Sequence, residues 1–228
     1  MAARHGIEGA GVDGDFHLRR SLGLRPRFGT KLKVMTPRER AMIRDFPLHL
    51  HSPRLELRAP TPDDADFIHP AIVASHEVLK PWMSWAKTLP TFEETKLYCR
   101  RALWEWHDRE SLDYRLFFEG AFVGNCAVHT IQWHVPSAQL GYWQHADFGG
   151  RGLISEAVDR LTEFAFEELD LARLEIRCNA KNSASANVAT RAGFELEAHL
   201  KHSFRDNAGE LSDALFFAKT RVPREVPN

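Results

Sequence analysis

The sequence predicts a mixed α/β domain whose elements follow the order β-α-α-β-β-β-α-β-α-β-β. Three observations predict it: short segments that alternate apolar and polar residues, longer segments with apolar residues every three or four positions, and a glycine-rich turn that joins a strand to a helix. With 228 residues, the chain suits one such domain and an extension. We expect a basic, unstructured extension at residues 1–46 that holds a short helix near 36–43, the domain at 47–222, and a tail at 223–228.

Strands are expected where residues alternate or where aromatic and branched side chains cluster. The predicted strands are residues 54–58, 114–118, 122–131, 139–144, 173–178, 194–200 and 211–219. Glu119-Gly120 lies between the second and third of these and is typical of a hairpin turn.

Helix starts are indicated by capping residues. Thr61-Pro62-Asp63-Asp64 combines an N-cap, a proline in the first turn and acids, and predicts a helix that ends before Pro81. Thr91 and Glu94 have the spacing of a capping box, which predicts a helix to about Trp106. Two further helices are expected, one after the glycine turn to about residue 169 and a short one at residues 186–191.

The charge is unevenly distributed. Up to Arg44 the chain has ten Lys and Arg against four Asp and Glu, so this part carries +6 and the remainder −7. A basic arm on an acidic body can indicate contact with nucleic acid or the ribosome. The simpler interpretation, which we prefer, is an unstructured leader, or a true start at Met35 or Met42.

Cysteine and histidine content excludes two classes of protein. Cys99, Cys126 and Cys178 contain no C-x-x-C pair, which favours the cytoplasm over a disulfide scaffold. His199 and His202 fall in a strand-and-turn region without a helical face of ligands, so no metal is expected. There is no apolar run of about 18 residues, so we expect no membrane span. The sequence leaves open a monomer or a homodimer.

The turn Gly149-Gly150-Arg151-Gly152 is the feature most indicative of function. It joins the strand at 139–144 to a helix, so N–H groups from Phe148 to Leu153 are expected to converge at the positive end of that helix. Such a turn suits a phosphate or diphosphate. The alternative is a plain turn whose glycines are present only to adopt positive φ.

Further motifs surround this turn in a fixed order: Gly141-Tyr142-Trp143, Gly150-Arg151-Gly152-Leu153, Ser155-Glu156-Ala157, Arg177-Cys178, Asn182-x-x-Ser185, Ala192-Gly193-Phe194 with Glu197, and Asp213-Ala214-Leu215-Phe216-Phe217. With these motifs, residues 54–219 resemble the GCN5-related N-acetyltransferase (GNAT) family. The likeness is greatest to the ribosomal-protein alanine/serine branch of RimJ/RimL type. The resemblance implies a GNAT acyl-CoA N-acyltransferase fold in which two central strands splay apart to admit the pantetheine arm.

The resemblance also implies roles in binding the donor. The turn of Phe148, Gly149, Gly150, Arg151, Gly152 and Leu153 would hold the diphosphate of acetyl-CoA, and Asn182 would brace the pantetheine. The family often has Gln or Arg where this chain has Asp147, an acid that would have to point outward. The side chain of Arg151 could contact a phosphate or remain in solvent.

Catalytic roles follow from the same resemblance. The backbone N–H of Trp143, or of a neighbour, would polarise the thioester carbonyl, and the Ser185 hydroxyl would stabilise the departing thiolate. In the alternative interpretation Tyr142 and Trp143 pack in the core, and Asn182, Ser183 or Ser185 only caps the following helix.

The proton acceptor and the acceptor pocket are less well defined. The glutamate assigned as base in the ribosomal-protein branch aligns near Phe204, so Glu197 and His202, with His199, are the substitutes. Trp82, Trp85 and Tyr142 are assigned to the acceptor pocket; the alternative is that the loop aromatics, Trp82 and Trp85, cover the edge of the core.

The predicted function is transfer of an acetyl group from acetyl-CoA to a primary amine by direct attack. Freeing an α-amine at pH 7 costs only about 1 kcal/mol, against about 4.6 kcal/mol for lysine, so a site without a strong base favours a protein or peptide N-terminus. Alternatives are a small-molecule amine, another acyl-CoA such as succinyl-CoA, or a non-catalytic acyl-CoA-binding module.

Overall fold

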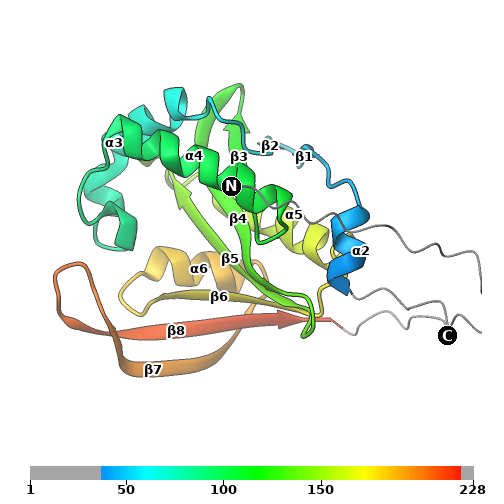
Figure 1. Cartoon of the computed structure of the whole chain (residues 1–228). Coiled ribbons are helices and arrows are strands. Elements are labelled where there is room, and N and C mark those ends of the chain that lie inside the picture. Colours follow the sequence, from blue (N-terminus) through cyan, green and yellow to red (C-terminus); the bar gives the residue numbers. More distant parts are fainter. Residues whose placement is uncertain (1–36, 222–228) are drawn as a thin grey trace, which may run out of the picture. The chain divides into compact units, whose positions relative to one another are not determined.

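The computed structural model describes residues 37–221 (Figure 1). The rest of the expected extension, up to residue 36, and the tail from residue 222 lie outside the described residues. In chain order the elements are α2 (Pro37–Ile43), β1 (His49–His51), β2 (Leu55–Arg58), α3 (Ala65–Leu79), η1 (Ser84–Ala86), α4 (Phe92–His107), β3 (Ser111–Phe118), β4 (Ala121–Gln132), β5 (Ser137–Gln144), η2 (Ala146–Phe148), α5 (Leu153–Glu167), β6 (Arg173–Asn179), α6 (Ser183–Arg191), β7 (Glu195–Arg205) and β8 (Leu211–Thr220). The predicted order of strands and α-helices is confirmed, and β1 is an additional strand that pairs with β2.

The described strands form one mixed sheet in the order β1-β2-β3-β4-β5-β6-β8-β7. Neighbours are antiparallel except for β5 and β6, which are parallel. The parallel pair joins two antiparallel halves, one built from β1 to β5 and the other from β6, β8 and β7. The mixed α/β fold expected from the sequence is therefore confirmed.

The two halves part at the junction between β5 and β6. These strands pair only at Ser137 with Arg173, Ala138 with Leu174, and Gln139 with Glu175. Beyond Gln139, β5 continues to Gln144 beside β4, and β6 continues to Asn179 beside β8. The two strands diverge visibly in Figure 1. The splayed central strands predicted from the sequence are present.

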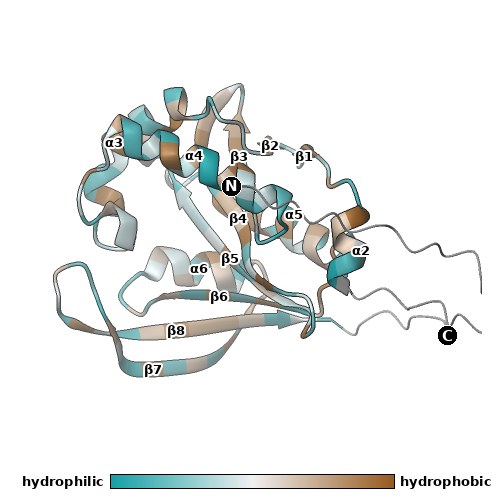
Figure 2. Cartoon of the chain, in the orientation of Figure 1, coloured by the Kyte–Doolittle hydropathy of each residue, from teal (hydrophilic) through white to brown (hydrophobic). Residues whose placement is uncertain are grey.

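Helices cover both faces of the sheet because strand side chains alternate between them. Leu116 of β3 belongs to the larger hydrophobic cluster, together with Leu161 of α5. Phe117, its neighbour, belongs to a second cluster with Trp143 and with Ile68 of α3. Figure 2 shows hydrophobic stretches along β3 and β4, the strands between these layers. We call these the α5 face and the α3 face of the sheet.

The core extends into the segment before residue 47. Ala41 of α2 and Phe46 are buried in the larger cluster, and the Phe46 ring packs edge-to-face on Phe164 at 6.0 Å. Residues on both sides of the expected boundary at 46/47 therefore share one core. No helix in the described part of the chain is long and apolar enough to cross a membrane.

The two predicted helix starts differ in outcome. Thr91 and Glu94 form the predicted capping box with both reciprocal hydrogen bonds. The start predicted at Thr61 is too early, because α3 begins at Ala65. The Asp64 carboxylate accepts a hydrogen bond from the Thr61 N–H at 2.9 Å and another from the buried Arg115 Nε at 2.7 Å. The intervening residues therefore form a turn.

Candidate active site

The glycine turn presents a row of free backbone donors. Gly150 and Gly152 have φ of 74° and 73°, a conformation that glycine adopts readily because it has no Cβ. Within residues 37–221 the backbone N–H groups of residues 150–155 have no hydrogen-bond acceptor, whereas those of Phe148 and Gly149 donate to His145 O and Ala146 O. The free donors therefore start two residues later than predicted and continue into the first turn of α5, at its positive end.

A carboxylate inside α5 fixes this turn to the edge of the sheet. Glu156 accepts hydrogen bonds from Ser52 Oγ and Arg54 N, both at 2.7 Å, and from Arg54 Nε at 2.6 Å. Arg54 also donates to Arg151 O at 3.0 Å. Partial burial opposes ionisation, but these hydrogen bonds lower the pKa of Glu156 below its ordinary value. Glu156 therefore stays ionised, and the Arg54 guanidinium 2.6 Å away offsets its negative charge beside the turn.

The charged side chains of the turn are arranged for an anion as well. The Asp147 side chain is 82% exposed, and its carboxylate lies 3.9 Å from His145 Nδ1. The Arg151 guanidinium lies 5.2 Å from the centre of the Phe148 ring and donates to Asp147 O at 3.4 Å. Arg151 is thus held beside the free N–H groups.

The register of β5 determines which N–H groups face the strand gap. The His145 N–H donates to Val123 O of β4 at 2.9 Å, and Trp143, two residues earlier, faces the same neighbour because antiparallel ladders repeat every two residues. Tyr142 and Gln144 point the other way, where β5 has no partner strand in the described sheet. The register therefore favours Tyr142 and Gln144 over Trp143, the predicted donor to the thioester carbonyl.

Tyr142 and Ser185 meet on the α5 face of the gap. The Tyr142 hydroxyl lies 3.0 Å from Ser185 Oγ and donates to Ser185 O at 3.1 Å. Asn182 is the N-cap of α6 and accepts from the Ser185 N–H at 3.1 Å, so the capping alternative holds for Asn182. Burial raises the pKa of Tyr142 well above its ordinary value. The predicted acceptor-pocket residue Tyr142 is instead the partner of Ser185.

Trp82, Trp85 and Trp143 lie on the α3 face, around two pockets. A pocket of about 510 Å³ is lined by Trp85, which is 43% exposed, and by the buried Trp143, whose rings lie 6.0 Å apart. A smaller pocket of about 230 Å³ is lined by Trp82. Both pockets include Ser84, so they adjoin at η1. The structure thus places Trp82 and Trp85 on the side of the sheet opposite Ser185, next to the end of β5.

The predicted proton acceptors are not brought to these pockets. Glu197 is paired with Arg173, at 2.6 Å, beside the closed end of the strand gap, and these hydrogen bonds lower its pKa. His202 lies on the edge strand β7, with φ of 49°, and its N–H donates to Asp213. His199 Nε2 lies 2.8 Å from the same carboxylate. Glu197 is therefore corrected to a structural ion-pair partner.

Residues 54–195 match the model of the acetyltransferase (GNAT) domain, which is more than half of the chain. The chain belongs to the GNAT acetyltransferase family. The ribosomal-protein-serine acetyltransferase of Escherichia coli (strain K12) is 26% identical over 152 residues, 67% of this chain and 85% of that protein. The YdaF protein of Bacillus subtilis (strain 168) is 29% identical over 143 residues, 61% and 77% of the two chains.

Solved structures of GNAT enzymes have the same fold. RimL, a ribosomal L7/L12 α-N-protein acetyltransferase in complex with coenzyme A, has a TM-score of 0.70 and 26% identity, covering 76% of this chain and 96% of that one. A Salmonella typhimurium acetyltransferase that modifies the N-terminal serine of ribosomal protein L7/L12 has a TM-score of 0.68 and 26% identity, covering 75% and 97%.

Sequence reasoning overlooked one residue of this GNAT site. Glu156 stands in a matched motif but received no role. The available signal was electrostatic: an acid in the first turn of a helix that binds an anion needs a cation nearby. Its partner, Arg54, is 102 residues away in the sequence, so spacing alone does not identify it.

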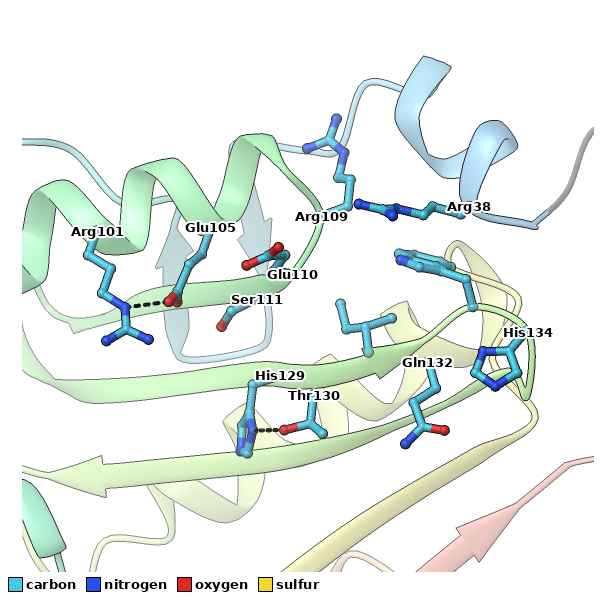
Figure 3. Close-up of a pocket in the computed structure, with 12 residues that line it drawn as sticks. Arg38, Arg101, Glu105, Arg109, Glu110, Ser111, His129, Thr130, Gln132 and His134 are labelled. Atoms are coloured by element: carbon cyan, nitrogen blue, oxygen red, sulfur yellow. Dashed lines mark hydrogen bonds and ion pairs between the residues drawn. The ribbon is translucent and has the colours of Figure 1, made fainter.

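The GNAT domain has another pocket, of about 950 Å³, at the end of the sheet where β5 begins. Figure 3 shows Arg101 and Glu105 of α4 paired on one side of it, and His129 bonded to Thr130 of β4 on the other. None of the predicted site residues lines this pocket. It is separate from the strand gap, since the glycine turn follows the opposite end of β5.

Proposed function

We propose that this GNAT protein is a cytoplasmic enzyme that transfers an acetyl group from acetyl-CoA to the N-terminal α-amine of a protein. One observation carries the proposal: β5 and β6 separate after Gln139, and the six free N–H groups of residues 150–155 lie just beyond the end of the separated β5. A diphosphate on those donors leaves the attached arm beside an unpaired strand edge. The unpaired cysteines Cys99, Cys126 and Cys178 support a reducing compartment.

The order of groups along β5 supports one position for the thioester. From the glycine turn, the pantetheine arm passes Gln144 first and then Tyr142, both with N–H groups directed into the gap. Tyr142 is also the residue that contacts Ser185. The thioester carbonyl therefore belongs at the Tyr142 N–H, with its sulfur near Ser185.

The reaction then needs one bond to form and one to break. The amine nitrogen attacks the carbonyl carbon, and the oxyanion accepts a hydrogen bond from the Tyr142 N–H. As the C–S bond breaks, the Ser185 hydroxyl donates to the thiolate, and the Tyr142 hydroxyl, 3.0 Å from Ser185 Oγ, turns its single proton from Ser185 O to that Oγ. Because burial raises the pKa of Tyr142, that hydroxyl keeps its proton at neutral pH. The proton lost by the amine passes to solvent, and the thiolate takes one up as CoASH.

The acceptor pockets favour an amine that loses its proton readily. They contain two carboxylates, Glu94 and Asp206. Hydrogen bonds from Thr91 lower the pKa of Glu94. For Asp206, burial is outweighed by hydrogen bonds from the Glu210 N–H, Ser212 and the Ala208 N–H, which lower its pKa. Neither is a strong base, so an α-amine with a pKa of about 7.7–8.0 is a better acceptor than lysine.

The names of the relatives support the same acceptor class. The RimL structure is described as an α-N-protein acetyltransferase of ribosomal L7/L12, and the E. coli relative as a ribosomal-protein-serine acetyltransferase. We therefore include ribosomal-protein N-termini among the acceptors. Contact with the ribosome through the basic segment before α2, and the choice between monomer and homodimer, remain predictions.

A mass-spectrometric screen tests the proposal. The full-length protein is incubated with acetyl-CoA or succinyl-CoA and a panel of N-terminal peptides, lysine peptides with blocked N-termini, and small amines. The expected result is a 42 Da gain on peptides with a free α-amine, with release of CoASH. A mass gain only on lysine peptides or small amines would show that the acceptor is one of those amines and not an α-amine. A mass gain only with succinyl-CoA would show that the donor is succinyl-CoA and not acetyl-CoA. Binding of acetyl-CoA without acyl transfer to any amine would overturn the proposal.

A further inference from the structure

The smaller acceptor-side pocket carries an unpaired arginine. This pocket, of about 230 Å³, lies between the loop after α3 and the β7–β8 hairpin, and its lining includes Trp82, Ser84, Arg177, Asn179 and Phe204. Arg177 stands on β6 two residues beyond Glu175, the last residue that pairs with β5. The arginine is thus at the lip of the strand gap.

Alternation along β6 places Arg177 on the acceptor side. Leu174, Ile176 and Cys178 belong to the larger cluster on the α5 face. Arg177 therefore points to the α3 face. Across the strand pair its guanidinium carbon lies 5.0 Å from the centre of the Phe216 ring. Ser185, the proposed contact of the acyl donor, and Arg177 consequently lie on different sides of the gap. Arg177 is therefore available to the amine substrate.

The Arg177 guanidinium has a defined place but no counterion. It lies between two rings, 5.0 Å from that of Phe216 and 5.8 Å from that of Phe204. Within residues 37–221 no carboxylate forms an ion pair with it, whereas Arg173 on the same strand pairs with both Glu175 and Glu197. Two rings hold the cation while its donor edges stay free for a planar anion.

Hydrogen bonds fix the walls of this pocket, and hydrogen bonds within the hairpin also engage its acidic residue, Asp206. Asn207 at the hairpin tip donates to Lys80 O at 2.7 Å and to Met83 O at 2.8 Å, which ties the hairpin to the loop before η1. The Asp206 carboxylate accepts three hydrogen bonds inside its own turn, from the N–H groups of residues 208 and 210 and from Ser212. The acid that lines the pocket is therefore committed to its turn.

We infer that Arg177 selects acceptors that carry a carboxylate a short distance from the reacting amine. Through Ser84 the pocket adjoins the larger pocket lined by Trp85 and Trp143. An amine that reaches the strand gap from these pockets therefore leaves its neighbouring group beside the Arg177 guanidinium. The carboxylate is either an acidic side chain near the N-terminus of a peptide or the free carboxyl of a short peptide. This inference rests on the proposed function and adds a determinant of substrate choice.

Matched peptides test the inference with the full-length protein and saturating acetyl-CoA. One pair is Ser-Glu-Ala-Ala-amide and Ser-Gln-Ala-Ala-amide; the other is Ser-Ala-Ala as free acid and as amide. CoASH release should give kcat/KM values about 10- to 100-fold higher for the acid of at least one pair, the size expected of a charge-assisted hydrogen bond. The pair that shows the preference identifies the source of the carboxylate.

Variants assign that preference to Arg177. Arg177→Gln should abolish it while leaving kcat/KM for the amide or Gln peptide within about twofold, and Arg177→Lys should retain part of it. Arg205→Gln is the control, because Arg205 lines the same pocket but donates to Gly209 O; it should keep the preference. An equal preference in wild type and Arg177→Gln would overturn the inference, as would turnover of neutral peptides with no preference in wild type.

A binding measurement separates this inference from the proposed function. The same peptides, with the C-terminal Ala replaced by a Cys that carries a fluorophore on its sulfur, are titrated with protein and CoA by fluorescence anisotropy. Tighter binding of the acidic peptide to wild type than to Arg177→Gln supports the inference even if no acetyl transfer is seen. The absence of transfer would then contradict only the proposed function. Equal binding by both proteins would overturn the inference whatever the turnover.

Discussion

The contact between Tyr142 and Ser185 leads to a specific pattern of rate losses. Ser185→Ala removes the hydroxyl that we assign to the departing thiolate but keeps the Ser185 N–H that Asn182 uses as its cap partner. A hydrogen bond to a charged group contributes about 1.5–3 kcal/mol, so kcat should fall about 10- to 150-fold. The KM for acetyl-CoA should change little, because the free N–H groups of residues 150–155 are untouched.

Tyr142→Phe gives the second arm of the same experiment. It removes the hydroxyl that contacts both Ser185 Oγ and Ser185 O; loss of the neutral hydrogen bond to Oγ, of about 1 kcal/mol, should slow kcat about fivefold. Because we place Tyr142 behind Ser185, the double variant should be no slower than Ser185→Ala, and the two losses should not multiply. Initial rates of CoASH release at saturating substrates measure all four proteins.

Thr190→Val is the control for that cycle, since Thr190 is a hydroxyl residue of the same helix whose Oγ donates to Ala186 O at 3.0 Å. It should leave kcat unchanged. A rate for Ser185→Ala within twofold of wild type would refute the assignment of the thiolate donor. Fully multiplicative losses in the double variant would refute the link from Tyr142 to Ser185.

Three further predictions follow from the charges of the fold. Arg115 is buried between Asp64, at 2.7 Å, and Asp113, at 2.8 Å, so Arg115→Met should lower the free energy of unfolding by about 3–5 kcal/mol in urea titration, whereas Arg173→Met at a partly exposed pair should cost under about 1 kcal/mol. A loss for Arg115→Met as small as that for Arg173→Met would contradict this. Because the pKa of Glu156 is lowered by folding, its stabilisation is complete above the unfolded pKa of about 4.3 and is lost as pH falls through the folded value; the stability difference between wild type and Glu156→Gln should shrink in that window, and a difference that stays constant would count against it. The kcat/KM for an α-amine peptide should rise between pH 6 and 9 with a midpoint near the amine's own pKa, about 8, and show no fall from Tyr142; a midpoint well below the amine's pKa would instead indicate a general base on the protein.

Local features of the sequence predicted most of the fold. The capping box of Thr91 and Glu94 depends on residues three apart, and the glycine turn depends on four consecutive residues, so both are readable in a short window. The helix start at Thr61 was misplaced for the opposite reason. The Thr61 hydroxyl, the predicted cap, donates to Asp64 Oδ1 at 2.6 Å instead of accepting from a backbone N–H, and the same carboxylate binds Arg115, 51 residues away from Asp64.

The site was predictable in its parts but not in its register. A motif identifies β5 as the strand that borders the gap, yet whether Tyr142 or Trp143 turns its N–H toward the gap depends on the pairing of β5 with β4. A shift of one residue in that pairing would exchange them. Likewise, Glu197 was a reasonable base until its partner was known, and that partner, Arg173, lies on a strand that is not its neighbour in the sheet.

The parted strands need an explanation of their own, because an unpaired strand edge normally costs backbone hydrogen bonds. Each half of the sheet is complete without the other: β5 pairs with β4 to Gln144, and β6 pairs with β8 to Asn179. Among the described residues, the hydrogen bonds that link the halves across the gap include Tyr142 to Ser185 on the α5 face and Asn207 to the loop after α3 on the other face. The first contact belongs to the proposed chemistry, and the second forms a wall of the acceptor pocket. Both contacts therefore link the halves of the sheet and also border the sites that we propose for donor and acceptor.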